Sequence, residues 1–295
     1  MAHYRRALVA LSLGNADFDL VDYGAMLCCV NGIGELDLVH VAEQRAPELE
    51  RIWNERKQAF AERLPDHVRS NRLFHHLLEG DRTDKLLEFS AERQSDVILL
   101  GQSAGHNQRR SLARRLAMNA LCSVWLIPDR APAKISRVVV PVDLSDRSAD
   151  SLQEAISVAI LAGLREVTAL HVYFDPAIVT YNQGAGQALR KDEHELAGFL
   201  QTIDPHGLRI VPRSIEKSNV AHAIHRVCAE EGADLIVMGT RGRSRAASIL
   251  LGSETEQALM ESRIPILAVK HFGARRGLID VLLQRLGEQE DTHFG

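Results

Sequence analysis

The sequence predicts an α/β protein built from two tandem copies of a doubly wound parallel sheet. Two observations support this fold class: short apolar runs alternate with helix-like patterns, and the first half of the chain resembles the second. Runs such as VVVPV (138–142) and DLIVMG (234–239) are apolar without alternation, as in strands that are buried on both faces. Strands that alternate with helices form parallel sheets with helices on both faces.

Length and composition are those of an ordinary globular protein with about two domains. The chain has 295 residues, of which 45% are hydrophobic, and a formal net charge of −4, whereas single domains run roughly 100–200 residues. A protein without a global positive field is not expected to have nucleic acid as its main partner. No apolar stretch reaches about 18 residues, so we expect no membrane span. The basic and apolar start of the chain lacks a signal-peptide cleavage site.

The four cysteines are Cys28, Cys29, Cys122 and Cys228, and none of them shows C-x-x-C spacing. This pattern argues against a zinc ribbon, and two adjacent cysteines make a poor disulfide pair. We therefore expect reduced cysteines in the core and a cytoplasmic location, because reducing compartments keep thiols free.

Four aligned pairs of segments show the internal repeat. The pairs are RRALVALSLGNAD (5–17) with SRVVVPVDLSDRS (136–148), GELDLVHVAE (34–43) with REVTALHVYF (165–174), SDVILLG (95–101) with ADLIVMG (233–239), and SVWLI (123–127) with PILAV (265–269). Their offsets are 131, 131, 138 and 142 positions. The offset grows while the order of elements stays the same, which indicates a duplication with longer loops in the second copy.

Each copy is expected to contain five strands with a helix between each pair, the third strand being weak and a glycine loop following the fourth. In the second copy LQEAISVAILAG places Leu152 and Ile156 on one helix face and ends at Gly163, and VAHAIHRVCAEEG ends in the same way at Gly232. Glycine is favoured just after a helix because it adopts the left-handed conformation without strain. APAKIS (131–136) is the expected linker between the copies.

A glycine-rich segment of the second copy is the most informative motif. GTRGRSRAASILLGSE (239–254) directly follows the fourth strand-like run. Glycines between a buried strand and a helix let backbone amides approach an anion, and the helix N-terminus adds its dipole. Ligands of doubly wound sheets bind beyond the carboxyl ends of the strands, where the strand order reverses. The segment matches neither the P-loop nor the G-x-G-x-x-G fingerprint, yet it predicts a phosphate-binding loop.

The spacing of Gly239, Gly242, Gly252 and Ser253 resembles the nucleotide-binding pattern of the universal stress protein family, in its ATP-binding subgroup. Asp143, at the end of the first strand of the same copy, matches the family pattern as well. The resemblance implies an adenine-nucleotide alpha-hydrolase-like fold with two five-stranded sheets of strand order 3-2-1-4-5. The expected parts of the chain are a degenerate domain (1–130), a nucleotide-binding domain (136–271), and an amphipathic helix with an acidic tail (272–295).

The resemblance implies that the second copy binds ATP, with AMP or ADP as alternatives. The implied site residues are Pro141, Val142, Asp143, Val172, Met238, Gly239, Arg241, Gly242, Gly252, Ser253, Glu254 and Thr255. By analogy Asp143 holds the ribose or adenine, Val172 packs on adenine, and Gly252 with Ser253 binds phosphates. Ser253 and Glu256 also have the spacing of a capping box, which marks a helix N-terminus.

Glu254 departs from the family pattern, which has a small or apolar residue at this position. A carboxylate beside phosphates repels them unless it points outward or reaches a divalent ion such as Mg²⁺. On the solvent side it interacts favourably with the helix dipole instead, which is the interpretation we favour. Arg241, Arg243 and Arg245 flank the loop and are placed to offset triphosphate charge.

The first copy lacks the features that predict a nucleotide site. Ser12 stands where the second copy has Asp143, and the loop GQSAGHNQRRSLARRL (101–116) has no Gly-Ser pair. The segment between the fourth and fifth strands is also four residues shorter. We therefore expect this copy to bind no ATP, and either to pack against the second copy or to hold a different ligand. Its arginines, such as Arg114 and Arg115, suit an anion or a solvated helix face, and we favour the solvated face.

Taken together, these patterns predict a stress-response regulator that binds one nucleotide per chain and is not a dedicated enzyme. A slow Mg-dependent ATPase using Asp143, Glu254 and Glu256, and a scaffold that needs no nucleotide, remain the alternatives. The expected partners are a second copy of the chain or an intramolecular pseudo-dimer, together with an unknown protein. His222 and His225 lie three residues apart on a helix, but no third ligand has a suitable spacing, so we predict no metal site.

Overall fold

The computed structural model describes most of the chain. The described residues are 4–31, 33–69, 72–102, 107–173, 185–216, 219–240 and 262–270. The implied site residues Arg241, Gly242, Gly252, Ser253, Glu254 and Thr255 lie outside them, as does the expected C-terminal helix.

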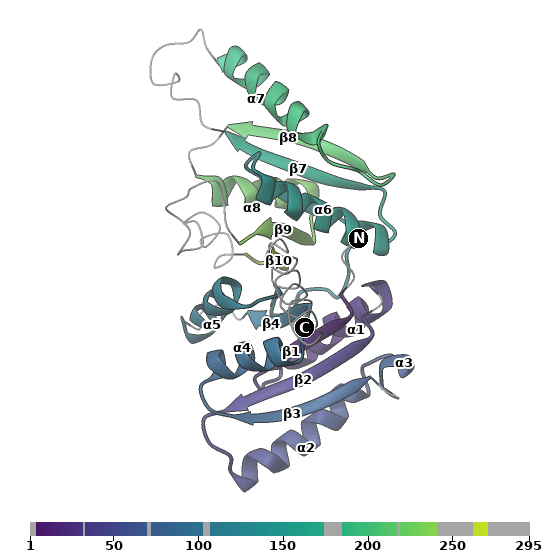
Figure 1. The fold of residues 1–295 in the computed structure, drawn as a ribbon, viewed down its shortest axis with the longest axis vertical. Coiled ribbons are helices and arrows are strands. Elements are labelled where there is room, and N and C mark those ends of the chain that lie inside the picture. The colour runs from purple at the N-terminus through teal and green to yellow at the C-terminus, as the bar shows by residue number, and fades with distance from the viewer. Residues whose placement is uncertain are drawn as a thin grey trace, which may run out of the picture.

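Strands and helices alternate along both halves of the chain (Figure 1). The first half contains β1 (Arg6–Leu11), α1 (Asp17–Asn31), β2 (Glu35–Ala42), α2 (Pro47–Ala61), α3 (Asp66–Arg69), β3 (Leu73–Glu79), α4 (Arg82–Glu92), β4 (Val97–Gln102), α5 (Asn107–Asn119) and β5 (Ser123–Pro128). The second half contains β6 (Val138–Val142), α6 (Asp146–Leu161), β7 (Glu166–Tyr173), α7 (Ala185–Leu200), β8 (Arg209–Glu216), α8 (Val220–Glu231), β9 (Leu235–Gly239) and β10 (Ile266–Val269).

The strand order confirms the predicted topology and adds a junction between the halves. The order is β3-β2-β1-β4-β5-β10-β9-β6-β7-β8, so each half has the order 3-2-1-4-5 and the two halves form one ten-stranded sheet. Strands are parallel within each half, whereas β5 and β10 pair antiparallel. Residues of both strands are buried, and an apolar strand edge left unpaired is a site of aggregation. The palindromic order gives the chain the arrangement of an intramolecular pseudo-dimer.

The helix ends of the second half agree with the sequence. Ser145 caps α6, where its hydroxyl accepts a hydrogen bond from Ser148 N–H, and the helix is followed by Gly163 with φ +72°. Helix α8 begins after Asn219, whose side chain accepts from His222 N–H, and ends at Gly232 with φ 66°. The predicted terminal glycines therefore adopt the left-handed conformation for which they were singled out.

A carboxylate ties down the first strand at the amino-terminal edge of each half. Asp96 accepts hydrogen bonds from the backbone N–H groups of Arg5 (2.8 Å) and Arg6 (3.0 Å). Asp234 accepts from the backbone N–H groups of Ser136 (2.9 Å) and Arg137 (2.9 Å) in the same way. Because these N–H groups precede the sheet ladder, the carboxylate satisfies donors that would otherwise be left unpaired. The sequence analysis aligned these segments but did not assign this role to the two aspartates.

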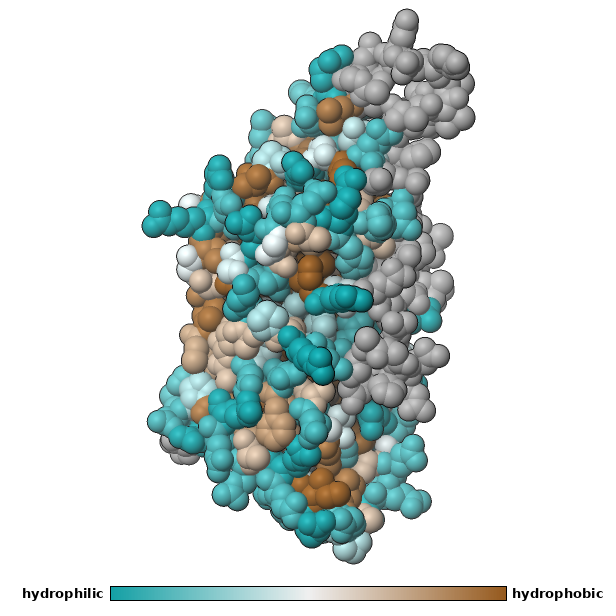
Figure 2. All heavy atoms as spheres, turned by 180° about the vertical axis from the view of Figure 1, so that it is seen from behind, coloured by the Kyte–Doolittle hydropathy of each residue, from teal (hydrophilic) through white to brown (hydrophobic). Residues whose placement is uncertain are grey.

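The core lies on both faces of the sheet and continues across the junction. Trp125 of β5 is fully buried and meets Tyr23 of α1 edge-on, with 5.8 Å between ring centroids. On the surface, Figure 2 shows hydrophilic side chains interspersed with separate hydrophobic ones over the described part of the rear face. No helix among the described residues is both long and apolar enough to cross a membrane.

The cysteines correct one expectation. All four are free, and Cys28, Cys122 and Cys228 are buried as expected, but Cys29 is exposed. Successive side chains of a helix point about 100° apart, so on α1 Cys28 faces the protein core while Cys29 faces solvent.

Candidate functional site

The described part of the implied nucleotide site lies at the carboxyl edge of the second half. Strand register places Val142 of β6 beside His171 of β7, so that Asp143 and Val172 follow at the same level. Val138 and Val139 of β6 pair with Leu235 and Ile236 of β9, which carries Met238 and Gly239 to the same edge. This is the switch point between the first and fourth strands of a 3-2-1-4-5 sheet, where ligands of doubly wound folds bind.

A short serine network orients the Asp143 carboxylate. Its Oδ1 accepts hydrogen bonds from Ser145 N–H (3.2 Å) and from the Ser145 hydroxyl (2.5 Å). Leu144, between them, has φ 59°, a left-handed conformation that is uncommon outside glycine and occurs frequently at functional sites. The turn therefore holds the carboxylate, which is half-buried, at the rim of the sheet where a ligand can reach it.

The remaining described site residues are apolar and lie at the ends of β6, β7 and β9. Val142 and Met238 are each 5% exposed, whereas Pro141, Val172 and Gly239 are half-buried. Val172 packs against the cluster that contains Met238. Such a surface at strand ends suits a flat aromatic ring better than a polar group, because apolar area is removed from water without unpaired hydrogen-bonding groups.

Two further residues stabilise the carboxyl edge of the second half, and the sequence did not mark either of them as a site residue. His171 Nδ1 lies 2.7 Å from Asp192 Oδ1 of α7, which fixes the end of β7 just before Val172. Thr240 N–H donates to the Val269 carbonyl at 3.3 Å, so the start of the glycine-rich segment is attached to β10. The repeated His-Val pair was visible in the sequence, but the partner on α7 depends on tertiary packing.

The equivalent position in the first half has a different carboxylate. Ser12 replaces Asp143 as predicted, and its hydroxyl donates to Asp17 Oδ1 at 2.9 Å. Asp17 Oδ2 also accepts from the backbone N–H groups of Ser12 (2.8 Å) and Leu13 (2.6 Å). Asp17 is 4% exposed, so its hydrogen-bonding capacity is directed to the turn itself.

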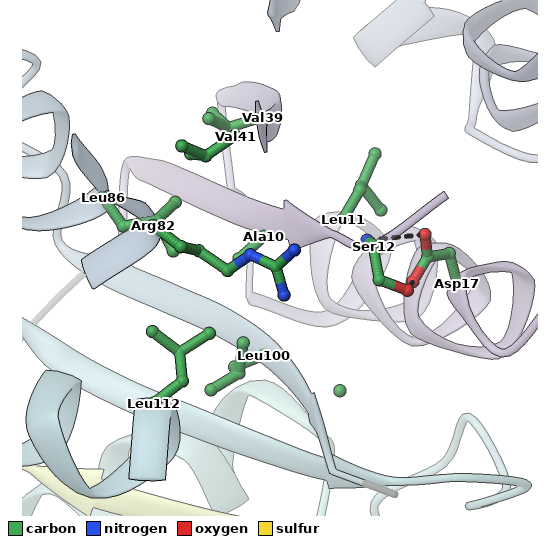
Figure 3. A pocket seen from close by; sticks show the side chains of 11 residues that line it. Ala10, Leu11, Ser12, Asp17, Val39, Val41, Arg82, Leu86, Leu100 and Leu112 are labelled. Carbon is green, nitrogen blue, oxygen red and sulfur yellow. Dashed lines mark hydrogen bonds between the residues drawn. The ribbon is translucent and has the colours of Figure 1, made fainter. Parts of the chain in front are cut away.

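The pocket at the corresponding place in the first half is small; Figure 3 shows the side chains that line it. The pocket at the ends of β1, β2 and β4 has a volume of about 20 Å³ and is lined by Leu86, Leu100 and Leu112 among others. A water molecule needs roughly 10–15 Å³ measured in this way, so the pocket has room for about one water and no purine. That the first half binds no ATP stays a prediction.

Histidines of the first half serve the fold. His75 and His76 of β3 point to opposite faces, as expected for a strand: His75 packs on Trp53 of α2 and His76 on Phe89 of α4. Burial is the main reason why the pKa of His75 is lowered, which favours its neutral form. Within the described ranges there is no group of three His, Cys, Asp or Glu side chains able to hold a metal ion.

Comparisons with known proteins agree with this architecture. A family profile described as "Universal stress protein family" matches residues 134–270, that is, the second half. Universal stress protein MJ0531 from Methanocaldococcus jannaschii is 30% identical over 140 residues, which cover 45% of this chain and 81% of the relative. Universal stress protein YxiE from Bacillus subtilis is 29% identical over 149 residues, covering 46% of this chain and 99% of the relative.

A solved structure extends the likeness to both halves. The crystal structure of a universal stress protein from Archaeoglobus fulgidus aligns over 90% of this chain and 96% of its own, with a TM-score of 0.63 and 17% sequence identity. At that identity the match shows the fold. The similarity to MJ0531, together with the family profile, shows that this chain belongs to the universal stress protein family.

Proposed function

We propose that the second half binds one ATP per chain and that the protein is a nucleotide-dependent regulator of the stress response. One observation carries the proposal: an oriented carboxylate, apolar residues at the strand ends and the start of the glycine-rich segment meet at the switch point of the sheet. Asp143 is the residue for ribose hydroxyls, because an ionised carboxylate accepts hydrogen bonds from two donors. Val172 and Met238 are the residues for the adenine ring.

The phosphate part of the proposal depends on sequence. Gly242, Gly252, Ser253 and Thr255 are proposed to bind phosphates, with Arg241 offsetting their charge and Glu254 pointing to solvent. Backbone N–H groups at a helix start favour anions through their unpaired donors and the helix dipole.

We also propose an assembly, a cellular location and a contact segment for the protein. The antiparallel junction of β5 and β10 supports an intramolecular pseudo-dimer, in which one chain supplies both halves. Four free cysteines suit a reducing compartment such as the cytoplasm. The amphipathic segment 272–295 is proposed to contact a protein partner or the body of the chain.

Calorimetry with ATP, ADP and AMP on the full chain tests the site. We expect one nucleotide per chain, and no measurable binding after Gly252→Ala combined with Ser253→Ala, because the methyl group added at position 252 keeps phosphate from the backbone and the Ser253 hydroxyl is lost as a donor. Ser12→Ala, at the position of the first half that corresponds to Asp143, is the control and is expected to leave the affinity unchanged. Equal affinity of the double variant and the parent protein would overturn the assignment.

A phosphate-release assay on the same proteins distinguishes a regulator from an enzyme. Sustained turnover that disappears in the double variant would favour the slow ATPase, and binding without turnover supports the regulator. Absence of any nucleotide binding would favour the scaffold.

A further inference from the structure

A second cavity lies in the first half, beside the small pocket at the ends of β1, β2 and β4. It measures about 630 Å³ and is bounded by the ends of β2 and β3 and by α4 and α5. The polar residues of its lining that matter here are His40, Glu43, Asp81, Arg82, Ser111 and Arg115. Small-molecule sites typically have volumes of roughly 300–1,000 Å³ and occur at the carboxyl edges of such sheets. The cavity therefore has the size and the place of a ligand site.

The two halves carry different residues where the helix before the fourth strand begins. Helix α4 begins at Arg82 after its cap Asp81, whereas its counterpart α8 begins at Val220 after Asn219. At these two positions the first half thus carries two charges and the second half carries none.

Two guanidinium groups are available to a ligand. Arg82 and Arg115 are both exposed, and within the described part of the chain neither side chain has a hydrogen bond or ion pair. Figure 3 shows the Arg82 side chain extending from α4 between Ala10 and Leu112, with its guanidinium group directed towards the end of β1. Arginine is the side chain best suited to hold a carboxylate or phosphate through two parallel hydrogen bonds.

The acidic lining residue nearest to these arginines is already engaged. Asp81 Oδ1 accepts hydrogen bonds from Thr83 N–H (2.8 Å) and Asp84 N–H (3.0 Å), capping α4. The bond from Asp84 is the largest influence that lowers the pKa of Asp81, and the positive charges of Arg115 and Arg82 lower it further. Both guanidinium groups therefore lie near one carboxylate that serves the helix, and an oxyanion can share them with it. Glu43, the other acid of the lining, is exposed.

The inner wall of the cavity is rigid and uncharged. His40 is 5% exposed, lies 3.0 Å through Nδ1 from the Leu11 carbonyl, and stacks on Trp53. Burial is the main cause that lowers the pKa of His40, which favours its neutral form.

We infer that the first half binds a small metabolite through a carboxylate or phosphate group held by Arg82 and Arg115, at a site separate from the nucleotide site of the second half. The neighbouring pocket at the ends of β1, β2 and β4, with about 20 Å³, is too small for a purine. Both oxyanions present the same chemistry to a guanidinium pair, and the experiment below separates them.

The test uses calorimetry on the full chain carrying Gly252→Ala and Ser253→Ala, so that the phosphate loop of the second half contributes nothing. Inorganic phosphate and succinate are the two probes, each titrated alone. We expect one of them to bind with one equivalent per chain, and Arg82→Ala and Arg115→Ala each to weaken it by about tenfold or more. Arg82→Lys, which keeps the charge and loses the planar fork, is expected to give an intermediate loss.

Two controls make the result specific to the cavity. Arg51→Ala on α2 removes one exposed positive charge outside the cavity and is expected to leave the affinity unchanged. Gln44→Trp places a large ring in the lining from an exposed position and is expected to abolish binding. An equal loss in the Arg51 and Arg82 variants would show a general charge effect and overturn the proposal, as would failure of both probes to bind. Neither result depends on whether ATP binds the second half.

Discussion

The two halves of the chain share their amino-terminal edge and differ at their carboxyl edge. Asp96 and Asp234 tie down the first strand of each half through equivalent hydrogen bonds. By contrast, Ser12 and Asp17 of the first half stand at the positions of Asp143 and Ser148 in the second, so the acid and the hydroxyl have exchanged places. The amino-terminal edge, which supports the fold, is therefore alike in the two halves, whereas they differ at the carboxyl edge, where ligands of doubly wound sheets bind.

A second exchange lies inside the sheet. In the first half the fully buried Asp37 is paired with Arg93 (3.1 Å) and His76 (2.8 Å). At the equivalent positions of the second half, the Thr168 hydroxyl donates to Glu231 at 2.8 Å. Each set of partners satisfies its buried polar groups. Exchanging one member alone between the halves is destabilising, because a buried charge left without its partner is strongly destabilising.

The largest effect is expected from removing the Asp17 carboxylate of the first half. Asp17→Ala removes the acceptor of three hydrogen bonds from Ser12 and Leu13 in a buried turn. We expect a loss of about 3 kcal/mol in the free energy of unfolding, measured by urea denaturation. Ser148→Ala, at the equivalent position, is expected to lose about 1 kcal/mol. Equal losses in both variants would contradict the structural role given to Asp17.

Next in size is the loss of the exchanged acid in the second half. Asp143→Ala is expected to weaken ATP binding by about 10- to 100-fold, since hydrogen bonds to charged groups contribute about 1.5–3 kcal/mol. Calorimetry measures the affinity, and urea denaturation is expected to show a smaller loss of stability than for Asp17→Ala because Asp143 is only half-buried. A variant that unfolds as readily as Asp17→Ala but binds ATP normally would reverse the comparison.

A smaller effect concerns the contact between α1 and α6, where Tyr23 and Glu154 occupy equivalent positions. Glu154 is 4% exposed, and burial is the main cause that raises its pKa. Because its pKa is raised in the folded state, Glu154 contributes stability that is fully present below the pKa of the unfolded state. This stability is lost as the pH rises through the pKa of the folded state. Glu154→Gln is therefore expected to raise stability by about 1 kcal/mol at pH 8 and to change it little at pH 4. A pH-independent difference would contradict this.

The smallest effect compares the ends of two equivalent helices. Gln94 follows α4 with φ 53°, and Gly232 follows α8 with φ 66°. Gln94→Gly is expected to stabilise the protein by about 0.5–1 kcal/mol and Gly232→Ala to destabilise it by a similar amount. A Cβ atom at position 232 meets nothing within 4 Å, so the loss reports backbone conformation alone. Thermal unfolding of both variants measures the difference, and shifts of the same sign would refute it.

Much of the fold was predictable because its signals are local. Unbroken apolar runs marked the strands, and Gly163 and Gly232 marked the helix ends. The internal repeat indicated that both halves share one topology. The junction was not predictable, because the pairing of β5 with β10 depends on two edges that are far apart in the sequence.

The site was predictable in part, for the same reason. Asp143 and Val172 were identified through motif and register, and the strands bring them to one edge. Asp17 was missed, because its importance comes from the left-handed turn at Leu13 (φ 64°) rather than from any spacing. The cavity beside Arg82 was missed as well, since a concave surface between α4 and α5 leaves no pattern in the sequence.

The short strand β10 gives the molecule a switch-like joint. It follows the glycine-rich segment, lies between β9 and β5, and is anchored at its end by Lys270, whose backbone N–H donates to the Ser123 hydroxyl (3.2 Å) and whose Nζ donates to the Met118 carbonyl (2.9 Å). Side chains alternate between the faces of a strand, so a slip by one residue would turn Leu267 and Ala268 to the wrong faces. Because Leu267 and Ala268 each belong to a hydrophobic cluster shared by both halves, such a slip would disturb the packing of both halves at once.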